Sequence, residues 1–358
     1  MTDPAGLRLE ALRTWLATNV PEVDVRSELI PSLLAGGRSN VSYILTDASG
    51  QRFVLRRPPL GNLMPSAHDM KREFQVLHGL NSVHFPTPRV ISFCDDADVI
   101  GAPFVLMEFV DGNVIDTEFE SRKLAPKQTD SLSSNLVSAL STLHSIAPAH
   151  AGLDNLGRPD GYLQRQAKRW GEQWTLTKTR DLPEILQLHE WLTKSLAALP
   201  TDLPSSIVHG DFRIDNVIVN PTSFDIRAVL DWEMATLGDP VSDLAISLVY
   251  WSQPSDTLRA QVPVAQHVTD APGFWTRSQI VNEYSALTGF GLDHLDVCVA
   301  LACFKLAVIM ESIRKRAMSG QQLGEASHDV ETMGLATIAL TTLGLTVIES
   351  DAITALNS

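Results

Sequence analysis

Three oxygen-bearing side chains near the middle of the sequence have the types and spacing of a site for phosphoryl chemistry. Asp211 and Asn216 lie in the segment His-Gly-Asp-Phe-Arg-Ile-Asp-Asn, and Asp231 follows in Leu-Asp-Trp-Glu. One carboxylate can accept the proton of an attacking hydroxyl, while an amide oxygen and a second carboxylate can hold Mg²⁺ on phosphate oxygens. These residue types therefore suit phosphoryl transfer from ATP to an alcohol.

The residues between Asn216 and Asp231 predict a β-hairpin that positions these side chains. Residues 217–219 form a short β-branched run, residues 226–230 form a second, mainly apolar run, and typical turn residues separate them. Because a hairpin returns its two ends to the same place, we expect Asn216 and Asp231 beside Asp211. The alternative is that the hairpin carries three polar residues at its open end by chance. This alternative would require several independent spacings to agree by coincidence.

These motifs resemble the catalytic core of the aminoglycoside phosphotransferase-like kinases, distant relatives of the protein kinases. In that family the catalytic loop reads H-G-D-x-x-x-x-N, and the metal-binding Asp stands in an I/L-D-W-E setting. The wording HGDFRIDN, LDWEMATLGDP and VSDLA is most similar to the kinase-like domains of acyl-CoA dehydrogenase family proteins. The resemblance runs from about residue 30 to about residue 320 and is most specific in the catalytic loop.

The resemblance implies an α+β, protein-kinase-like fold with two lobes. A small antiparallel β-rich N-terminal lobe, residues 1–110, would bind the nucleotide, and a larger α-helical lobe, residues 111–358, would carry catalysis and substrate binding. Asp211 would be the catalytic base, with Asn216 and Asp231 as Mg²⁺ ligands and ATP as the phosphoryl donor.

Three further residues of the second lobe are expected to support the catalytic loop. The family implies that His209 braces the loop from behind and that Asp243 anchors it through hydrogen bonds to its backbone. An acid at a helix N-terminus, stabilised by the helix dipole, is a compatible interpretation of Asp243. Arg213 could face the phosphates or the substrate, or it could be exposed to solvent.

In the first lobe, Phe-Val-Leu-Arg at residues 53–56 takes the place of the V-A-I-K strand of kinases, with Arg replacing Lys. A guanidinium can clamp two phosphate oxygens, so the exchange is chemically reasonable. Arg56 and Arg57 point to opposite faces of a strand, and the sequence leaves open which one reaches the nucleotide. Glu73 is the natural ion-pair partner, with a solvated Glu on a surface helix as the alternative.

A glycine-containing turn at residues 36–40 would cover the phosphates through its backbone N–H groups. Taken alone, this turn is a common hairpin signal that lacks a full G-x-G-x-x-G. The residues at the lobe junction are expected, from the family, to offer backbone groups to adenine. The candidate nucleotide contacts besides Arg56 and Glu73 are Gly37, Ser39, Asn40, Glu108 and Val110.

The acceptor is the part of the function that the sequence defines least. Arg165, Arg169 and Trp170 resemble a substrate-side segment of the acyl-CoA dehydrogenase-linked branch, although packing of helix on helix also explains the tryptophan. That branch favours a hydroxyacyl acceptor, such as a CoA thioester. The alternatives are an aminoglycoside or choline-like amino-alcohol kinase, and a nucleotide-binding pseudokinase module without turnover.

The composition is that of an ordinary globular protein, with 44% hydrophobic and 20% charged residues. A net charge of −14 argues against nucleic acid as a partner. The three cysteines suggest no disulfide framework or metal-ligand spacing and fit a reducing compartment. The N-terminal residues lack a secretory signal, and the apolar run 333–348 is short for a membrane span. We therefore expect a cytoplasmic monomer or homodimer.

The periodicity of apolar residues predicts strands followed by helices. The expected strands of the first lobe are residues 33–34, 41–46, 52–56 and 104–107. The expected helices are 7–20, 66–80, 129–146, 162–177, 185–199, 242–250, 276–288, 294–317 and 330–345. The stretch 253–273 is the expected long loop.

Overall fold

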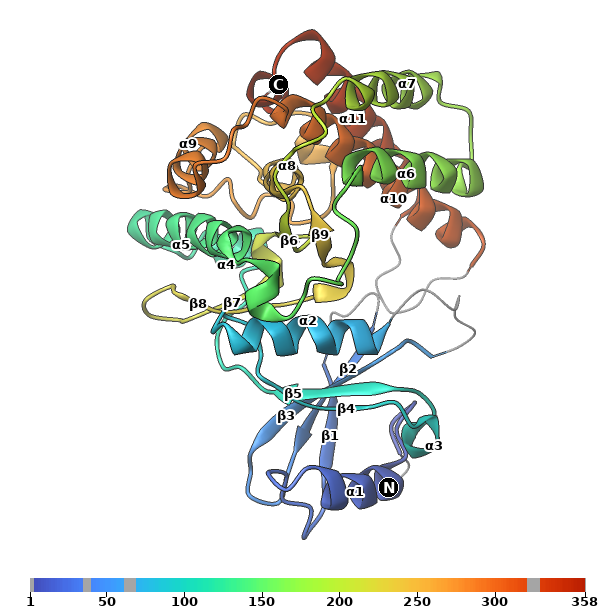
Figure 1. Cartoon of the computed structure of the whole chain (residues 1–358), viewed down its shortest axis with the longest axis vertical. Coiled ribbons are helices and arrows are strands. Elements are labelled where there is room, and N and C mark those ends of the chain that lie inside the picture. The colour runs from blue at the N-terminus through green and yellow to red at the C-terminus, as the bar shows by residue number, and fades with distance from the viewer. Residues whose placement is uncertain (1–2, 35–39, 61–68, 321–328, 358) are drawn as a thin grey trace. The chain divides into compact units, whose positions relative to one another are not determined.

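The computed structural model describes residues 3–34, 40–60, 69–320 and 329–357 (Figure 1). Contacts divide the chain into two compact units. The first unit is Met1–Asp111 with Ala228–Glu233, and the second is Gly112–Arg227 with Met234–Ser358. The division into residues 1–110 and 111–358 stays a prediction about domains. By its contacts, the short segment Ala228–Glu233, which lies far along the sequence, belongs to the first unit.

The first unit is built on a five-stranded antiparallel sheet with the order β1-β2-β3-β5-β4. Its strands are β1 (Ile30–Leu33), β2 (Val41–Thr46), β3 (Arg52–Arg57), β4 (Val90–Cys94) and β5 (Phe104–Glu108). Alternation along β3 buries Phe53, Leu55 and Arg57 on one face and directs Arg56 to the other. The sheet therefore separates the two adjacent arginines that the sequence left as alternatives.

The helices of the first unit lie on different sides of this sheet (Figure 1). Helix α1 (Leu9–Asn19) buries Leu12 and Leu16 in the core formed with Phe53 and Leu55, and short α3 (Ala97–Ile100) closes the same core. Helix α2 (Met70–Ser82) packs on β4 and β5 instead. Its N-cap, Asp69, accepts a hydrogen bond from the Arg72 backbone N–H at 3.0 Å.

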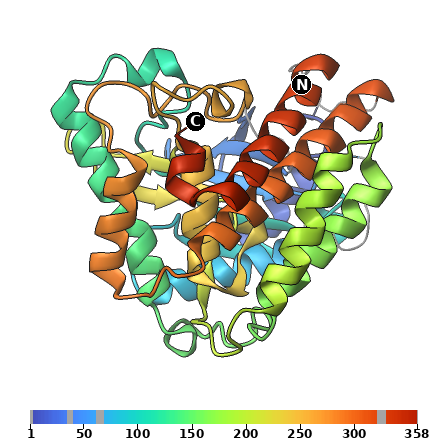
Figure 2. The same ribbon diagram turned by 90° about the horizontal axis from the view of Figure 1, so that it is seen from above.

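The second unit is mainly helical. Its long central helix, α10, packs against α11, α8, α6 and α7, and Figures 1 and 2 show α6, α7, α10 and α11 side by side. The helices are α4 (Glu118–Ser121), α5 (Pro126–Ser145), α6 (Tyr162–Thr177), α7 (Pro183–Ala197), α8 (Pro240–Tyr250), α9 (Arg277–Thr288), α10 (Leu295–Met318), α11 (Val330–Glu349) and α12 (Ala352–Leu356). The sheet in the first unit and these helices confirm the expected α+β class.

Four short strands frame the loops that carry the candidate catalytic residues. Strand β6 (Ser206–Val208) pairs antiparallel with β9 (Thr236–Gly238). Strands β7 (Val217–Val219) and β8 (Ile226–Val229) form the hairpin that the sequence predicts. The sequence analysis missed β6, β9 and β4, because three-residue strands and a half-buried edge strand give little periodicity.

Helix α11 is long and apolar enough to cross a membrane by length and composition. More than half of its most apolar window, 56%, is buried within the structure, where α11 packs on α10 and α7. Among the residues described, no other helix meets the same test. This degree of burial is typical of a core helix.

Candidate active site

The catalytic-loop segment leaves β6 at Val208 and passes through a tight turn at Gly210. The φ angle of Gly210 is +83°, and an added Cβ would lie 3.0 Å from both the Cβ and the carbonyl oxygen of Met234. A residue without a side chain is therefore required here, both for backbone conformation and for space. A single 3₁₀ turn, Ile214–Asn216, then leads into β7.

Asp243, in the first turn of α8, anchors this loop. Its carboxylate accepts the backbone N–H groups of His209 at 2.5 Å and Gly210 at 2.7 Å, and the ring of His144 lies 3.3 Å away. Asp243 is only 1% exposed. Burial acts to raise the pKa of its carboxyl, but the hydrogen bond and charge of His144 outweigh it and lower the pKa below its usual value.

The carboxylate of Asp211 is held by three donors. Oδ1 accepts the hydroxyl of Tyr250 at 2.8 Å, and Oδ2 accepts Arg213 Nε at 3.1 Å and Asn216 Nδ2 at 3.2 Å. Burial acts to raise the pKa of Asp211, but the charges of Arg213 and Lys305 and the Tyr250 hydroxyl lower it overall. Asp211 is therefore ionised at neutral pH, which is the state in which a carboxylate can accept a proton.

Arg213 and His209 both serve the loop itself. The Arg213 guanidinium contacts Asp211 and Asp215, and only 19% of its side chain is exposed. Arg213 is thus not a solvated arginine, and its side chain could turn towards a ligand only by breaking two ion pairs. His209 is fully buried, and its Nδ1 accepts the Asp211 backbone N–H at 3.2 Å.

Two residues that contact this loop escaped the sequence analysis. Tyr250 is the last residue of α8, and nothing in its local sequence marks it as a partner of Asp211. Lys305 lies in α10, and its Nζ donates to the Gly210 carbonyl at 2.7 Å. It is the only charged residue in the apolar run 297–310, and this isolated charge is the one feature of the sequence that could have marked Lys305 as a functional candidate. Burial lowers the pKa of Lys305, and the charges of Asp211 and Asp243 oppose this shift.

In the first unit, a cluster of ionic side chains forms around Arg56. Its Nε lies 3.1 Å from Glu73 Oε1, and its Nη2 lies 2.5 Å from Asp231 Oδ1 and 3.8 Å from Glu233 Oε2. Burial alone would lower the pKa of Arg56, but these carboxylates raise it above its usual value. Arg57, on the opposite face of β3, instead donates to the Ile100 carbonyl at 3.2 Å.

The other members of this cluster are buried or strained. Glu73 is 2% exposed, so it is not a solvated surface residue, and burial raises its pKa. Asp231 has a φ of 65°, a conformation uncommon outside glycine and often found at functional sites. Asn40 Nδ2 lies 3.4 Å from Glu73 Oε2 and 3.5 Å from Glu233 Oε2. Asn40 Oδ1 is buried and has no hydrogen-bond partner among the described residues.

Several predicted contacts stay predictions. Gly37 and Ser39 lie outside the described residues. The Glu108 backbone N–H donates to the Arg89 carbonyl at 2.9 Å, so only its carbonyl could serve adenine, and Val110 follows β5 in a half-buried position. Asp231 belongs to the first unit and Asp211 and Asn216 to the second. Their expected approach to one another is likewise a prediction.

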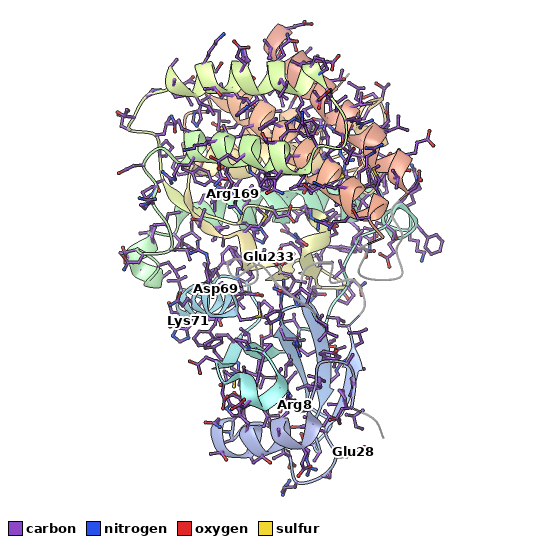
Figure 3. All side chains as sticks on the ribbon, turned by 90° about the vertical axis from the view of Figure 1, so that its right-hand side faces the viewer. Arg8, Glu28, Asp69, Lys71, Arg169 and Glu233 are labelled. Carbon is purple, nitrogen blue, oxygen red and sulfur yellow. The ribbon has the colours of Figure 1, made fainter. Side chains whose placement is uncertain are left out.

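The three substrate candidates differ in their surroundings. Trp170 is buried on α6, and its indole N–H has no acceptor among the described residues. Arg169 is exposed, with its guanidinium 5.7 Å from the Trp170 ring centroid (Figure 3). The Arg165 guanidinium donates to the carbonyls of Arg158 and Asp160, which ties it to the segment that precedes α6.

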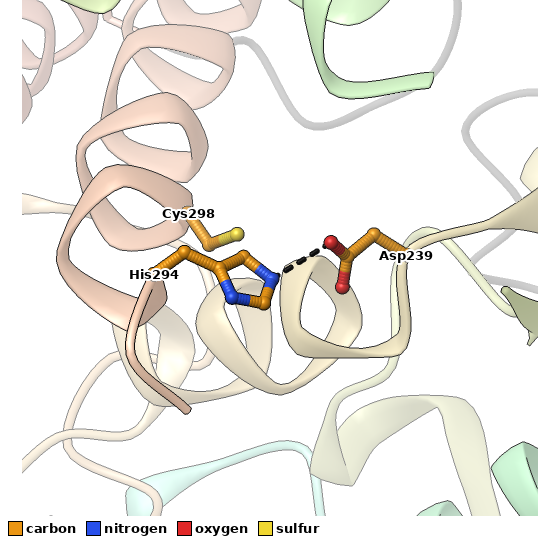
Figure 4. A group of neighbouring side chains, drawn as sticks. All are labelled: Asp239, His294 and Cys298. Atoms are coloured by element: carbon orange, nitrogen blue, oxygen red, sulfur yellow. Dashed lines mark hydrogen bonds and ion pairs between the residues drawn. The ribbon is translucent and has the colours of Figure 1, made fainter. Parts of the chain in front are cut away.

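A second polar group, absent from the sequence analysis, lies between α8 and α10 (Figure 4). One ligand atom each from Asp239, His294 and Cys298 lies within 4.8 Å of the other two. His294 Nε2 is 2.7 Å from Asp239 Oδ2, while Asp239 Oδ1 accepts the Val241 backbone N–H. Burial raises the pKa of Cys298 strongly and keeps the thiol protonated. We interpret the group as a buried hydrogen-bonded link between the two helix N-termini.

Comparison with known families assigns the chain. The sequence profile of the Phosphotransferase enzyme family, APH, matches residues 32–275, and the chain belongs to that family. A crystal structure from Ralstonia eutropha, of a candidate aminoglycoside phosphotransferase, is 28% identical, has a TM-score of 0.76 and covers 93% of this chain and 96% of that one. The GDP and kanamycin complex of APH(2″)-IIIa is 17% identical, with a TM-score of 0.56, and covers 94% and 97%. The protein-kinase-like fold expected from the sequence is thereby confirmed.

Among named relatives, acyl-CoA dehydrogenase family member 11 of Rattus norvegicus is 33% identical over 325 residues. The match covers 89% of this chain but 41% of that protein. Member 10 of Mus musculus is 34% identical, and its match covers 80% of this chain and 26% of that protein. The resemblance to the kinase-like parts of these proteins is therefore confirmed, while the chain spans well under half of their length.

Proposed function

We propose that the chain is an ATP- and Mg²⁺-dependent kinase that transfers the γ-phosphoryl group to the hydroxyl of a small molecule. The observation that carries this proposal is the Asp211 carboxylate, which is kept ionised and oriented by Tyr250, Arg213 and Asn216. Membership of the phosphotransferase family supports the same class of reaction.

The contacts of Asp211 leave room for an acceptor. A carboxylate has about four lone-pair positions, and three donors use three of them, so one position can accept the hydroxyl of the substrate. As the hydroxyl oxygen bonds to the γ-phosphorus, the bond between that phosphorus and the β,γ-bridging oxygen breaks, and ADP leaves. The hydroxyl proton passes to Asp211.

The donor set fits a hard divalent cation. Around Arg56, three carboxylates (Glu73, Asp231 and Glu233) face one guanidinium, so the cluster carries an excess of negative charge. In the second unit, Asn216 donates through Nδ2 to Asp211, which leaves its Oδ1 as the ligand atom. We propose Asp231 and Asn216 as the Mg²⁺ ligands, because Mg²⁺ prefers such oxygen donors. The ion would supply charge neutralisation on the phosphates.

For the acceptor, we propose a hydroxyacyl compound. Support comes from the two relatives named for acyl-CoA dehydrogenases, which contain a segment similar to this chain. An aminoglycoside or a choline-like amino alcohol is the alternative, since one structure of the same fold was solved with kanamycin. A nucleotide-binding module without turnover is a further alternative. Such a module would be expected to have lost the base or a metal ligand, whereas Asp211, Asn216 and Asp231 are all present.

The test is ADP release by the purified chain with Mg·ATP across four acceptor classes: hydroxyacyl-CoAs, free hydroxy acids, aminoglycosides and choline-like alcohols. Asp211→Asn should reduce acceptor-dependent release by about 10²–10⁴-fold while ATP still binds. Asp225→Asn is the matched control, because Asp225 is exposed in the turn between β7 and β8. Equal activity in wild type and Asp211→Asn would refute the assignment of the base. If ATP binds but no acceptor stimulates ADP release, the result would favour a nucleotide-binding module without turnover.

A further inference from the structure

A pocket within the second unit lies directly beside the catalytic loop. It holds about 380 Å³ of space, part of it open to solvent. Helix α6 contributes Tyr162 and Trp170, α8 contributes Ser242, and α10 contributes Lys305, while Gly210 of the catalytic loop forms part of the wall. The pocket is therefore bounded by the residue that precedes Asp211.

Two of the residues that line the pocket, Lys305 and Trp170, carry hydrogen-bond donors that have few or no acceptors among the described residues. The Lys305 ammonium has three N–H groups, and the acceptor found for it among the described residues is a neutral one, the Gly210 carbonyl. Trp170 is 8% exposed, and its buried indole N–H has no acceptor in the described structure. Lys305 Nζ lies 5.8 Å from the centroid of the Trp170 ring, so the two side chains are neighbours in the wall of the pocket. A buried donor without an acceptor is costly, so a ligand oxygen would stabilise this arrangement.

The nearby carboxylates are occupied by other partners. Asp243 accepts two backbone N–H groups of the loop and contacts His144. Asp211 is bonded to Tyr250, Arg213 and Asn216. Lys305 thus forms no ion pair with either, although their charges favour its protonated state. Exposed Arg169 adds a second cation on the same helix as Trp170.

We propose that this pocket binds an acceptor through an oxygen-rich group, a carboxylate or an acyl carbonyl, with Lys305 and Trp170 as the residues that select it. The proposal rests on the proposed kinase function and names the acceptor chemistry of that site. It disfavours a polycationic acceptor, because an ammonium group beside Lys305 would be repelled and would leave the Trp170 N–H without an acceptor.

The test compares three acceptors that share one carbon chain: β-hydroxybutyrate, its uncharged amide, and the corresponding amino alcohol. Wild-type protein should prefer the carboxylate over the amide and the amide over the amine, in kcat/KM with Mg·ATP. Lys305→Met should raise KM for β-hydroxybutyrate about tenfold to a hundredfold and abolish the preference. Trp170→Phe keeps the aromatic ring, removes only the N–H, and should give a smaller rise in the same KM. Lys168→Met, on the exposed face of α6, is the matched control and should leave all three values unchanged.

Thermal stabilisation by the same three compounds provides a readout that needs no transfer. β-Hydroxybutyrate should raise the Tm of the wild type and not that of Lys305→Met. Stabilisation without ADP release would count against the proposed transfer to these acceptors while supporting the pocket. A wild type that prefers the amine, a Lys305→Met variant that keeps the carboxylate preference, or the absence of any binding would overturn the proposal.

Discussion

Arg56 Nη2 lies 2.5 Å from Asp231 Oδ1, so the residue expected to hold phosphate is paired with a residue expected to hold metal. The ion pair uses Nη2 of the guanidinium and Oδ1 of the carboxylate, so each charge neutralises the other. Binding of Mg·ATP would supply both replacements, phosphate oxygens for the guanidinium and a cation for the carboxylate. The pair therefore compensates both charges within the first unit.

Removing Asp231 should separate the metal-dependent part of nucleotide binding from the rest. For Asp231→Ala, we expect the affinity for ATP to become nearly independent of Mg²⁺, since the variant lacks the charged metal ligand. Isothermal titration with Mg²⁺ and with EDTA measures the two affinities. Asp225→Asn serves as the control on an exposed carboxylate. A variant that retains the wild-type Mg²⁺ dependence would show that Asp231 is not a ligand.

Tyr250→Phe should alter the base without removing it. The tyrosine hydroxyl donates to Asp211 Oδ1 and so favours the ionised carboxylate; its loss should raise the pKa of Asp211. Because the base is then protonated at higher pH, the acidic limb of the kcat/KM profile should move to higher pH. We also expect kcat to fall by about tenfold, less than for loss of the carboxylate itself. An unshifted acidic limb would mean that the hydrogen bond does not tune the base.

Asp243→Asn should destabilise the fold in a pH-dependent manner. The amide presents N–H groups to loop donors, and we expect a loss of about 2–4 kcal/mol at neutral pH. The folded-state pKa of Asp243 lies below its unfolded value, so its carboxylate contributes stability above the unfolded pKa and loses it as the pH falls through the folded pKa.

The difference in unfolding free energy between wild type and Asp243→Asn should therefore shrink progressively as the pH falls below about 4, the unfolded pKa of an aspartate. Urea denaturation at a series of pH values measures it. Asp225→Asn should show almost no difference at any of these values, because its side chain is exposed. A difference that stays constant down to the acid limit would contradict the assignment of Asp243 as an ionised anchor.

Gly210→Ala should cost more than the same exchange at another glycine with positive φ. At Gly289, with a φ of +69°, an added Cβ meets nothing within 4 Å, so only backbone strain of about 1 kcal/mol is expected. At Gly210 the contact with Met234 adds to this strain, for a total of about 2–4 kcal/mol. Chemical denaturation of both variants measures the gap, and equal losses would show that the loop accommodates a methyl group.

The sequence pointed to candidate residues for the chemistry, but not to the side chains that contact them in the fold. Asp211, Asn216 and Asp231 stand in short motifs whose spacing is visible along the chain. Tyr250 and Lys305 reach the loop only because α8 and α10 pack beside it, and no local pattern encodes that packing.

The choice between Arg56 and Arg57 required the orientation of one strand relative to its core. The alternation of side chains along a strand predicts that Arg56 and Arg57 point to opposite faces, but it does not predict which face the apolar core covers. The core that α1 forms with Phe53 and Leu55 places Arg57 on the covered face of β3 and Arg56 on the opposite face, while contact of Arg56 with the nucleotide stays a prediction. The long helices were predictable from their periodicity, whereas three-residue strands such as β6 and β9 depend on partners distant in the sequence.

The segment Ala228–Glu233 belongs by its contacts to the first unit, although both of its neighbours along the chain belong to the second. The Val229 backbone N–H donates to the Pro86 carbonyl, and Trp232 packs edge-on against Phe85. The first unit is therefore discontinuous along the sequence, and no single cut of the chain separates the two units. A fragment ending at Asp111 would keep Glu73 but would lack Asp231 and Glu233, the other two carboxylates that pair with Arg56, so residues 1–111 alone cannot form the complete ionic cluster.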